Sequence, residues 1–430
     1  MKKVHPAKNS IINNIIYFLI ASSGLFLLLN RFPYLGIASF VILFLLGLIF
    51  IFIRRSVTTY HAEILGVLSI IYIYLILSYF ISGQTLSNFF SFSFLRYDGN
   101  FFFAYMPFFV LAINFLDYEK VTRIYTMILF SVFSIFSIIA IYGFMTDNPV
   151  LSMFELERDR GLMFNALNNA HNATGSVYAV VCLILLSFFL KEKRKVKYLY
   201  LLIFLLSMTG LFLTKSRGSY IGFAAGAAII LWFFFRSWKK FGIAVAAVTV
   251  TAIPAVYFSG IYSKIPDFFD LSGGTAGVRL RLWDKAWYLF QQSPLFGIGF
   301  GRYNDAGYEN IRLTGLDQIA AFFIEPKFDF SSGHAHNSYF HFLAETGALG
   351  LGLLLLFWVL CYLKILRAYN LTKNGFSKKI FLAGLGIIAA LFALSLTENY
   401  FSATTVMMCI SVFISLSLGL FWQEEQMVKP

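Results

Sequence analysis

Apolar runs of about the length of a membrane span recur along this chain and constrain its fold more than any other feature. A transmembrane helix needs about 20 mostly apolar residues. About twelve such runs are present, at 11–30, 35–53, 63–82, 100–116, 123–144, 173–190, 198–213, 219–235, 242–260, 347–364, 380–397 and 402–422. The sequence predicts an all-α polytopic membrane protein with about twelve transmembrane helices, forming one integral membrane domain over residues 1–430.

The overall composition agrees with this class. Hydrophobic residues make up 59% of the chain and charged residues 13%, whereas soluble domains carry about 25% charged residues. The first run lacks a cleavable signal pattern, so we expect it to be a retained span. The three cysteines, Cys182, Cys361 and Cys409, fall within apolar runs. We expect them to be packing residues rather than disulfide partners or metal ligands.

Lysine and arginine predict the orientation of the chain. They gather before the first apolar run and after every second run, at 2–8, 54–55, 120–123, 191–197, 236–240 and 364–379. Cytoplasmic loops are enriched in these residues, so both termini are predicted to be cytoplasmic. Topology thus accounts for most of the net charge of +13, and the charge does not require a nucleic-acid partner.

This orientation leaves three unusual outward segments. They are a loop at 145–172, a short turn with the sequence "LTKSRGSY", and a large loop at 261–337. The short turn places Lys215 and Arg217 at the membrane surface, where cations are costly and usually functional. Snorkelling to lipid headgroups is one interpretation. We favour a specific anionic ligand.

The large loop contains an amphipathic helix in the stretch "TAGVRLRLWDKAWYLFQQSP". Thr275 can cap its start and Pro294 stops its end. The spacing predicts a helix at the outer membrane interface, with Arg279 turned toward phosphate. Arg281 and Lys285 are expected on a solvated face. The following "GIGFGRY" follows a helix rather than a strand, so we reject a nucleotide-binding fingerprint.

Three of the six histidines lie where the large loop meets the next span, in "GHAHNSYFHFLAETGALG". His334, His336 and His341 could form a zinc site, since an H-x-H pair can chelate. They could instead cap the helix. In a third interpretation His336 is a general base, because an imidazole titrates near neutral pH, and Asn337 orients it or the substrate. Glu345 shares a helical face with His341.

Several of these motifs resemble, in order, those of the O-antigen ligase and O-antigen polymerase superfamily. The "HN" at 336–337 followed by "GALG" at 347–350 resembles its short signature. The segments "DRGLMFNALNN", "TKSRGSY" and "VRLRLWDKAWYLFQQSPLFGIGFG" resemble its other outward motifs. The resemblance covers residues of about 160–360, and the first five runs share only hydrophobicity.

The resemblance implies roles for individual residues. His336 would be the catalytic base, and Arg217 and Arg279 would bind diphosphate, with Arg160 as a further contact. Asn337 and Gly347 belong to the motif without needing to touch substrate. Lys215 precedes Ser216 where a neutral residue is common. It either adds a phosphate contact or reaches for headgroups.

The same resemblance implies the reaction. The donor would be a glycan on undecaprenyl diphosphate, in the bacterial cytoplasmic (inner) membrane, with the active site on the periplasmic face. The acceptor would be lipid A–core for a ligase, or another lipid-linked repeat unit for a polymerase. The shared motifs leave these two open. We expect direct, inverting transfer, since no paired-carboxylate arrangement is evident, and we expect neither a cofactor nor a metal.

Two other classes of function stay open at this point. A protein with about twelve spans could be a lipid-linked oligosaccharide flippase or another transporter, but internal repeats and midspan charges are expected there and neither is evident here. A non-catalytic subunit of an export complex would leave the histidine and arginines unexplained. Glu398, in the outward turn "LTENYF", could touch an acceptor, although we favour a solvated helix cap.

Overall fold

The computed structural model describes most of the chain from residue 61 onward. The described residues are 18, 38, 41–45, 48, 61–91, 94, 98–113, 117–146, 154–157, 161–165, 171–243, 246, 275–304 and 334–428. The helices among them are α3 (Ala62–Ile81), α4 (Leu86–Phe89), α6 (Asn100–Ile113), α7 (Tyr118–Thr146), α8 (His171–Lys191), α9 (Lys197–Leu213), α10 (Arg217–Phe235), α13 (Thr275–Gln292), α15 (Ser338–Leu371), α16 (Gly375–Leu394) and α17 (Thr404–Val428).

Within these residues, seven helices are long and apolar enough to cross a membrane: α3, α7, α8, α10, α15, α16 and α17. The shorter apolar helices α6 and α9 coincide with two further predicted runs. The fold is therefore that of a helical, polytopic membrane protein, as predicted. The predicted runs at 11–30, 35–53 and 242–260 lie largely outside the described residues. The count of twelve stays a prediction, as does the single domain over 1–430.

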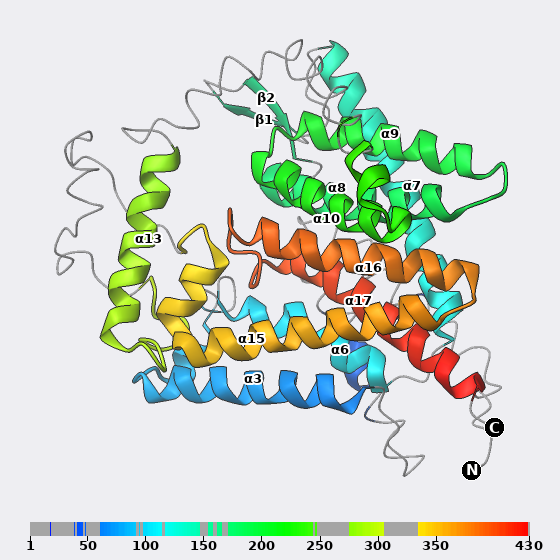
Figure 1. The fold of residues 1–430 in the computed structure, drawn as a ribbon. Coiled ribbons are helices and arrows are strands. Elements are labelled where there is room, and N and C mark those ends of the chain that lie inside the picture. Colours follow the sequence, from blue (N-terminus) through cyan, green and yellow to red (C-terminus); the bar gives the residue numbers. More distant parts are fainter. Residues whose placement is uncertain are drawn as a thin grey trace.

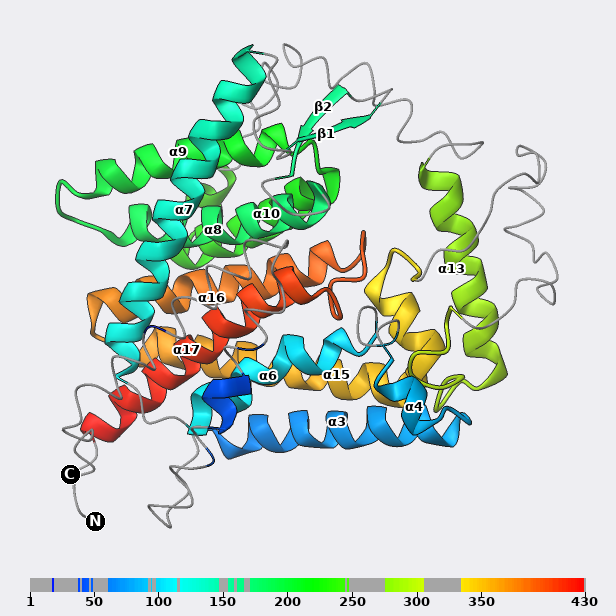
Figure 2. The same ribbon diagram turned by 180° about the vertical axis from the view of Figure 1, so that it is seen from behind.

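The helices form two groups that meet along α16. Helices α7–α10 lie on one side and α3, α6, α15 and α17 on the other, and the two views agree on this arrangement (Figures 1 and 2). Helix α10 packs on α16 and α8, and α17 packs on α6. The spanning part of α17 is 94% buried, against 22% for α10. Helix α17 is therefore central, and α10 is peripheral.

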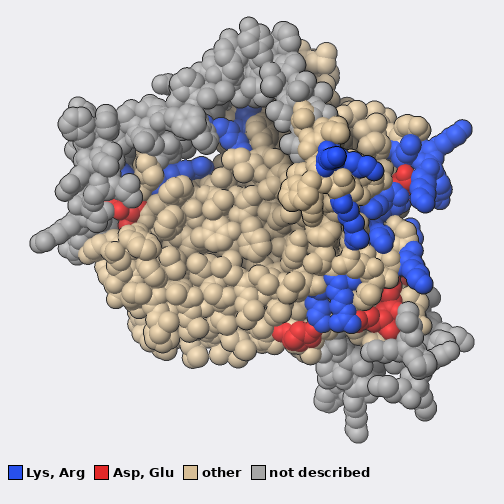
Figure 3. Space-filling model, viewed as in Figure 1, with Lys and Arg blue, Asp and Glu red and all other residues tan. Residues whose placement is uncertain are grey.

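The two ends of the bundle differ in charge. The α8–α9 turn, the end of α10 and the α15–α16 turn lie at one end, and α13 with the α16–α17 turn lies at the other (Figure 1). Lysine and arginine side chains gather at the first end, on the right of Figure 3. This is the end that the positive-inside rule assigns to the cytoplasm.

The outward segments contain one expected helix and one unexpected hairpin. Helix α13 begins at Thr275 and ends before Pro294, which confirms the helix predicted there. The loop at 145–172 contains two antiparallel strands, β1 (Phe154–Glu157) and β2 (Gly161–Phe164). The prediction of an all-α chain was wrong in this detail. The strand β1 reads Phe-Glu-Leu-Glu, a short apolar–polar alternation that is typical of a strand and that the prediction did not use.

Helix α15 is broken near its outer end at Gly347, which has φ 63° and ψ −171°. The loop that follows α13 fills the break. The N–H groups of Ala348 and Leu349 donate to the carbonyls of Pro294 and Leu295 (2.9 and 3.1 Å). Two N–H groups of the loop donate in return to carbonyls just before the break. These bonds satisfy backbone groups that a helix break would otherwise leave unpaired in apolar surroundings.

Gly347 is required at this break for two reasons. Its positive φ is costly for any residue with a Cβ, and a Cβ there would lie 2.4 Å from the carbonyl carbon of Leu295. We predict that Gly347→Ala lowers the free energy of unfolding by about 2 kcal/mol or more. The measurement is the thermal midpoint of the purified protein in detergent.

Gly352→Ala in the same helix is the matched control, because nothing lies within 4 Å of a Cβ at that position. Alanine there is expected to be neutral or to stabilise the helix slightly. Equal midpoints for the two variants would show that the loop does not fix the break.

Candidate active site

The start of α15 is locked against the turn between α16 and α17. Asn337 caps the helix, because its side-chain oxygen accepts hydrogen bonds from two N–H groups of the first turn (3.0 and 3.1 Å). Its amide nitrogen also donates to the carbonyl of Leu396 (3.2 Å). Ser338 donates through its N–H to Ser395 (2.8 Å) and through its hydroxyl to the carbonyl of Glu398 (2.9 Å). These bonds fix the turn that carries Glu398 beside His336, the residue before Asn337.

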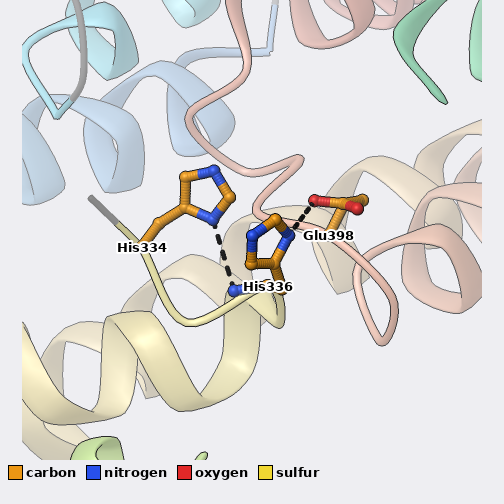
Figure 4. A group of neighbouring side chains, drawn as sticks. All are labelled: His334, His336 and Glu398. Atoms are coloured by element: carbon orange, nitrogen blue, oxygen red, sulfur yellow. Dashed lines mark hydrogen bonds and ion pairs between the residues drawn. The ribbon is translucent and has the colours of Figure 1, made fainter. Parts of the chain in front are cut away.

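That preceding residue, His336, faces the Glu398 carboxylate, as Figure 4 shows. Nδ1 of His336 lies 2.7 Å from Oε2 of Glu398, and Nη2 of Arg279 on α13 donates to Oε1 across 3.1 Å. An ionised carboxylate only accepts hydrogen bonds, so Nδ1 of His336 is the donor. In the neutral imidazole, Nε2 then carries the free lone pair. Glu398 thus links His336 and Arg279, two of the predicted site residues.

The ionised carboxylate of Glu398 is stabilised by the groups around it. Burial raises the pKa of Glu398, but the hydrogen bond from His336 and the charges of His336 and Arg279 outweigh it, so this pKa lies below its ordinary value. Burial and the neighbouring His336 lower the pKa of His334 to about 3. His334 is therefore neutral at pH 7, and its Nδ1 accepts the N–H of His336 (3.3 Å).

Residues at the starts of two further helices connect to the same carboxylate, one directly and the other through the first. Asn172, in the first turn of α8, donates to Oε1 of Glu398 (3.3 Å). Ser216, the residue before α10, does not cap its helix, and its hydroxyl donates to Oδ1 of Asn172 instead (3.0 Å). The N-termini of α8, α10 and α15 are therefore linked to one group. Helix N-termini carry partial positive charge and favour anions.

Arg217 begins α10 and has an exposed side chain. Its neighbour Gly218 lies so close to Thr397 that a Cβ would meet the threonine hydroxyl at 2.3 Å. The start of α10 is therefore pressed against the turn that carries Glu398. The structure brings the backbone of Arg217 to this turn, where Glu398 holds His336 and Arg279.

Lys215 and His336 share an unusual backbone conformation. Their φ angles are 53° and 47°, in the left-handed region that costs a non-glycine residue about 1–3 kcal/mol and clusters at functional sites. Nζ of Lys215 lies 5.5 Å from the centroid of the Phe144 ring. Arg160 lies outside the described residues, so its place in the site stays a prediction.

Among the described residues, two groups of side chains have the geometry to hold a metal ion. His334, His336 and Glu398 offer ligand atoms within 4.8 Å of one another, and so do Asp98, His341 and Glu345. The three-histidine zinc site considered from the sequence is not assembled, because His341 bonds to Asp98 (3.1 Å) in the second group. In the first group, Arg279 already neutralises Glu398, which disfavours another cation.

Two expectations about charged residues were wrong. Glu398 was expected to be a solvated cap, but its side chain is only 14% exposed. Contacts with other elements bury it, since His336, Arg279 and Asn172 all bond to its carboxylate. Lys285 was expected on a solvated face, but it is 4% exposed and its Nζ lies 4.5 Å from the Tyr303 ring centroid. Asn172 was not identified, because its role depends on a contact across 226 residues.

Residues 201–355 match the family model described as O-Antigen ligase. No curated protein matches the chain. The matched segment contains Arg217, Arg279 and His336, whereas Asn172 and Glu398 lie outside it. Over this segment, 155 of the 430 residues, the chain is similar to the O-antigen ligase family, a family of membrane glycosyltransferases.

Proposed function

We propose that this protein transfers a glycan from undecaprenyl diphosphate to a hydroxyl group of an acceptor sugar, on the periplasmic face of the inner membrane. The observation that carries the proposal is the contact of His336 with Glu398, which also binds Arg279. An imidazole whose Nε2 lone pair is available lies beside a cation near several helix N-termini, which supports His336 as the base. That combination suits proton removal from a hydroxyl and departure of an anionic leaving group.

In the proposed reaction, Nε2 of His336 takes the proton of the acceptor hydroxyl. The oxygen attacks the anomeric carbon of the donor while the bond from that carbon to the diphosphate oxygen breaks. Undecaprenyl diphosphate leaves, and the single displacement inverts the anomeric configuration. Glu398 stabilises the imidazolium that forms and holds the reactive tautomer. A positioned base of this kind contributes roughly 10²–10⁴-fold to the rate.

The arginines are proposed to stabilise the leaving diphosphate. Arg279 uses Nη2 for Glu398, and its buried Nε has no hydrogen-bond partner within the described part of the chain. Arg217 extends from the N-terminus of α10, and Lys215 precedes it. Guanidinium groups bind phosphate oxygens in pairs and are most effective in partly dry sites. Because the arginines neutralise the charge of the leaving diphosphate, the proposed transfer needs no metal ion.

Asn337 is proposed to position the site rather than to touch the sugar, since both ends of its amide are used in the cap and the turn. The acceptor is lipid A–core for a ligase or another lipid-linked repeat unit for a polymerase. Gel analysis of surface glycans after deletion separates these cases. Loss of all lipid A-linked chains indicates a ligase, and a single repeat on the core indicates a polymerase.

We predict that His336→Ala lowers glycan transfer by at least about 10²-fold, because the proton acceptor is lost. The assay measures transfer from the undecaprenyl-diphosphate-linked donor in membranes with matched protein content. His334→Ala is the control from the same loop, since its imidazole is neutral and its Nδ1 accepts the backbone N–H of His336. It should lower transfer by less than about tenfold. Normal transfer by His336→Ala would remove the assignment of the base.

Glu398→Gln should lower kcat for transfer, because an amide holds the reactive tautomer of His336 less firmly and does not stabilise the imidazolium that forms. Steady-state kinetics at matched protein content measure this kcat. Glu425→Gln, at the far end of α17, removes an equal charge from a pair at 3.9 Å and should leave kcat unchanged. An unchanged kcat in Glu398→Gln would show that the carboxylate does not support the base.

Arg217→Ala and Arg279→Ala should each raise the KM for the donor and lower kcat, with little change in the KM for the acceptor. The reason is that the diphosphate belongs to the donor alone, and its charge grows as the bond breaks. Steady-state kinetics with varied donor and varied acceptor distinguish the two effects. Arg217→Lys keeps the charge but loses the paired hydrogen bonds. Its kcat and its KM for the donor should therefore lie between those of the wild type and of Arg217→Ala. An unchanged donor KM and kcat in both alanine variants would assign the arginines structural roles.

A further inference from the structure

Three cations surround one aromatic ring at the end of the bundle opposite the candidate active site. The ring is that of Tyr369 on α15, which is 2% exposed. Nζ of Lys191, Cζ of Arg236 and Nζ of Lys378 lie 5.6, 5.9 and 5.3 Å from its centroid. Each cation comes from a different element: the last residue of α8, the C-cap of α10 and the first turn of α16. We call these three residues the basic triad.

The basic triad is not neutralised by carboxylates within the described residues. None of its members forms an ion pair there, and the acidic residue nearest in sequence, Glu192, is already bound by Lys379 (2.5 Å) and Arg194 (3.2 Å). Three like charges around one ring repel one another unless an anion lies between them. The aromatic ring contributes only a partial negative face.

Helix ends explain only part of this arrangement. Lys191 and Arg236 lie at helix C-termini, where the partial negative charge of the helix favours cations. Lys378 lies in the first turn of α16, where the helix end carries the opposite charge. Arg236 adopts a left-handed φ of 49° and donates to Oδ1 of Asn370 (2.8 Å). Its backbone strain indicates a position fixed by its surroundings.

The location of the triad indicates which kind of anion it would bind. The three residues lie at the ends of the membrane-spanning helices α8, α10 and α16, and lysine and arginine gather over that end of the bundle in Figure 3. This is the depth of lipid headgroups on the side that the positive-inside rule assigns to the cytoplasm. Basic pockets between membrane helices on that side bind anionic headgroups. A phosphodiester between the three cations would meet the charge that the described residues leave unbalanced.

We propose that Lys191, Arg236 and Lys378 form a binding site for the phosphate of an anionic glycerophospholipid in the leaflet opposite the candidate active site. The bound headgroup joins the ends of α8, α10 and α16 over Tyr369, whose hydroxyl donates to the carbonyl of Phe233 on α10 (3.2 Å). The lipid therefore links the two helix groups at this end of the molecule. This site is independent of the proposed transfer reaction.

The test is the thermal midpoint of the full-length protein in a neutral detergent. Phosphatidylglycerol is added in one arm, phosphatidylcholine in a second and inorganic phosphate in a third. We expect a rise in midpoint with phosphatidylglycerol alone. The triple variant Lys191→Gln, Arg236→Gln, Lys378→Gln should lose this rise. Lipid titration followed by native mass spectrometry should show affinity for phosphatidylglycerol falling on the order of a hundredfold, since each cation contributes roughly fivefold.

The matched control is Lys193→Gln, Lys239→Gln, Lys240→Gln, which removes three exposed cations from the same end. It should retain the response to phosphatidylglycerol. An equal loss in both triple variants would reduce the effect to general surface charge, and a full response to inorganic phosphate would assign the site to a free anion. An equal response to phosphatidylcholine would also overturn the proposal. If the triple variant does not fold, the single variant Lys378→Gln must weaken lipid binding by roughly fivefold while Lys193→Gln does not.

Discussion

The carboxylate of Glu398 is the interaction on which the candidate site depends. It lies largely away from water in a turn between two apolar helices, where an ionised group is stable only with several donors. His336, Arg279 and Asn172 supply those donors from three separate elements. The same bonds that make the buried charge tolerable also orient the imidazole and bring α13 to the membrane helices. Stability of the charge and geometry of the site therefore have one physical cause.

The rest of the fold holds this turn in place. Asn337 and Ser338 tie it to the start of α15, and Gly218 allows α10 to lie against it. The break at Gly347 lets the loop after α13 bond to the backbone of α15, which fixes the outer helix that carries Arg279. Close backbone approach at Gly218 and Gly347 thus helps to set the positions of Glu398 and Arg279.

Local patterns in the sequence predicted much of this structure. Long apolar runs predicted the membrane helices, and the capping threonine and terminal proline predicted α13 between Thr275 and Gln292. The short "HN" motif singled out His336, which the structure places beside Arg279 through Glu398. These features depend on residues close together in the chain, so a single sequence contains the information for them.

Contacts between distant segments were not predictable in the same way. Glu398 and Lys285 were expected in water because charged residues in loops usually are, and only tertiary packing buries them. Asn172 has no local motif, and in the β1–β2 hairpin only β1 shows an alternating pattern, whereas β2 does not. The basic triad likewise joins three helix ends around Tyr369. The sequence alone assigned these cations only to topology.

The central claim is that residues from α10, α13 and the start of α15 bind one diphosphate-linked donor around Glu398. An experimental structure with undecaprenyl diphosphate bound tests it most directly. We expect the diphosphate within hydrogen-bond distance of Arg217 and Arg279, with Nε2 of His336 facing the space that an acceptor hydroxyl would occupy. A diphosphate bound away from these residues, or a His336 turned away from it, would contradict the account.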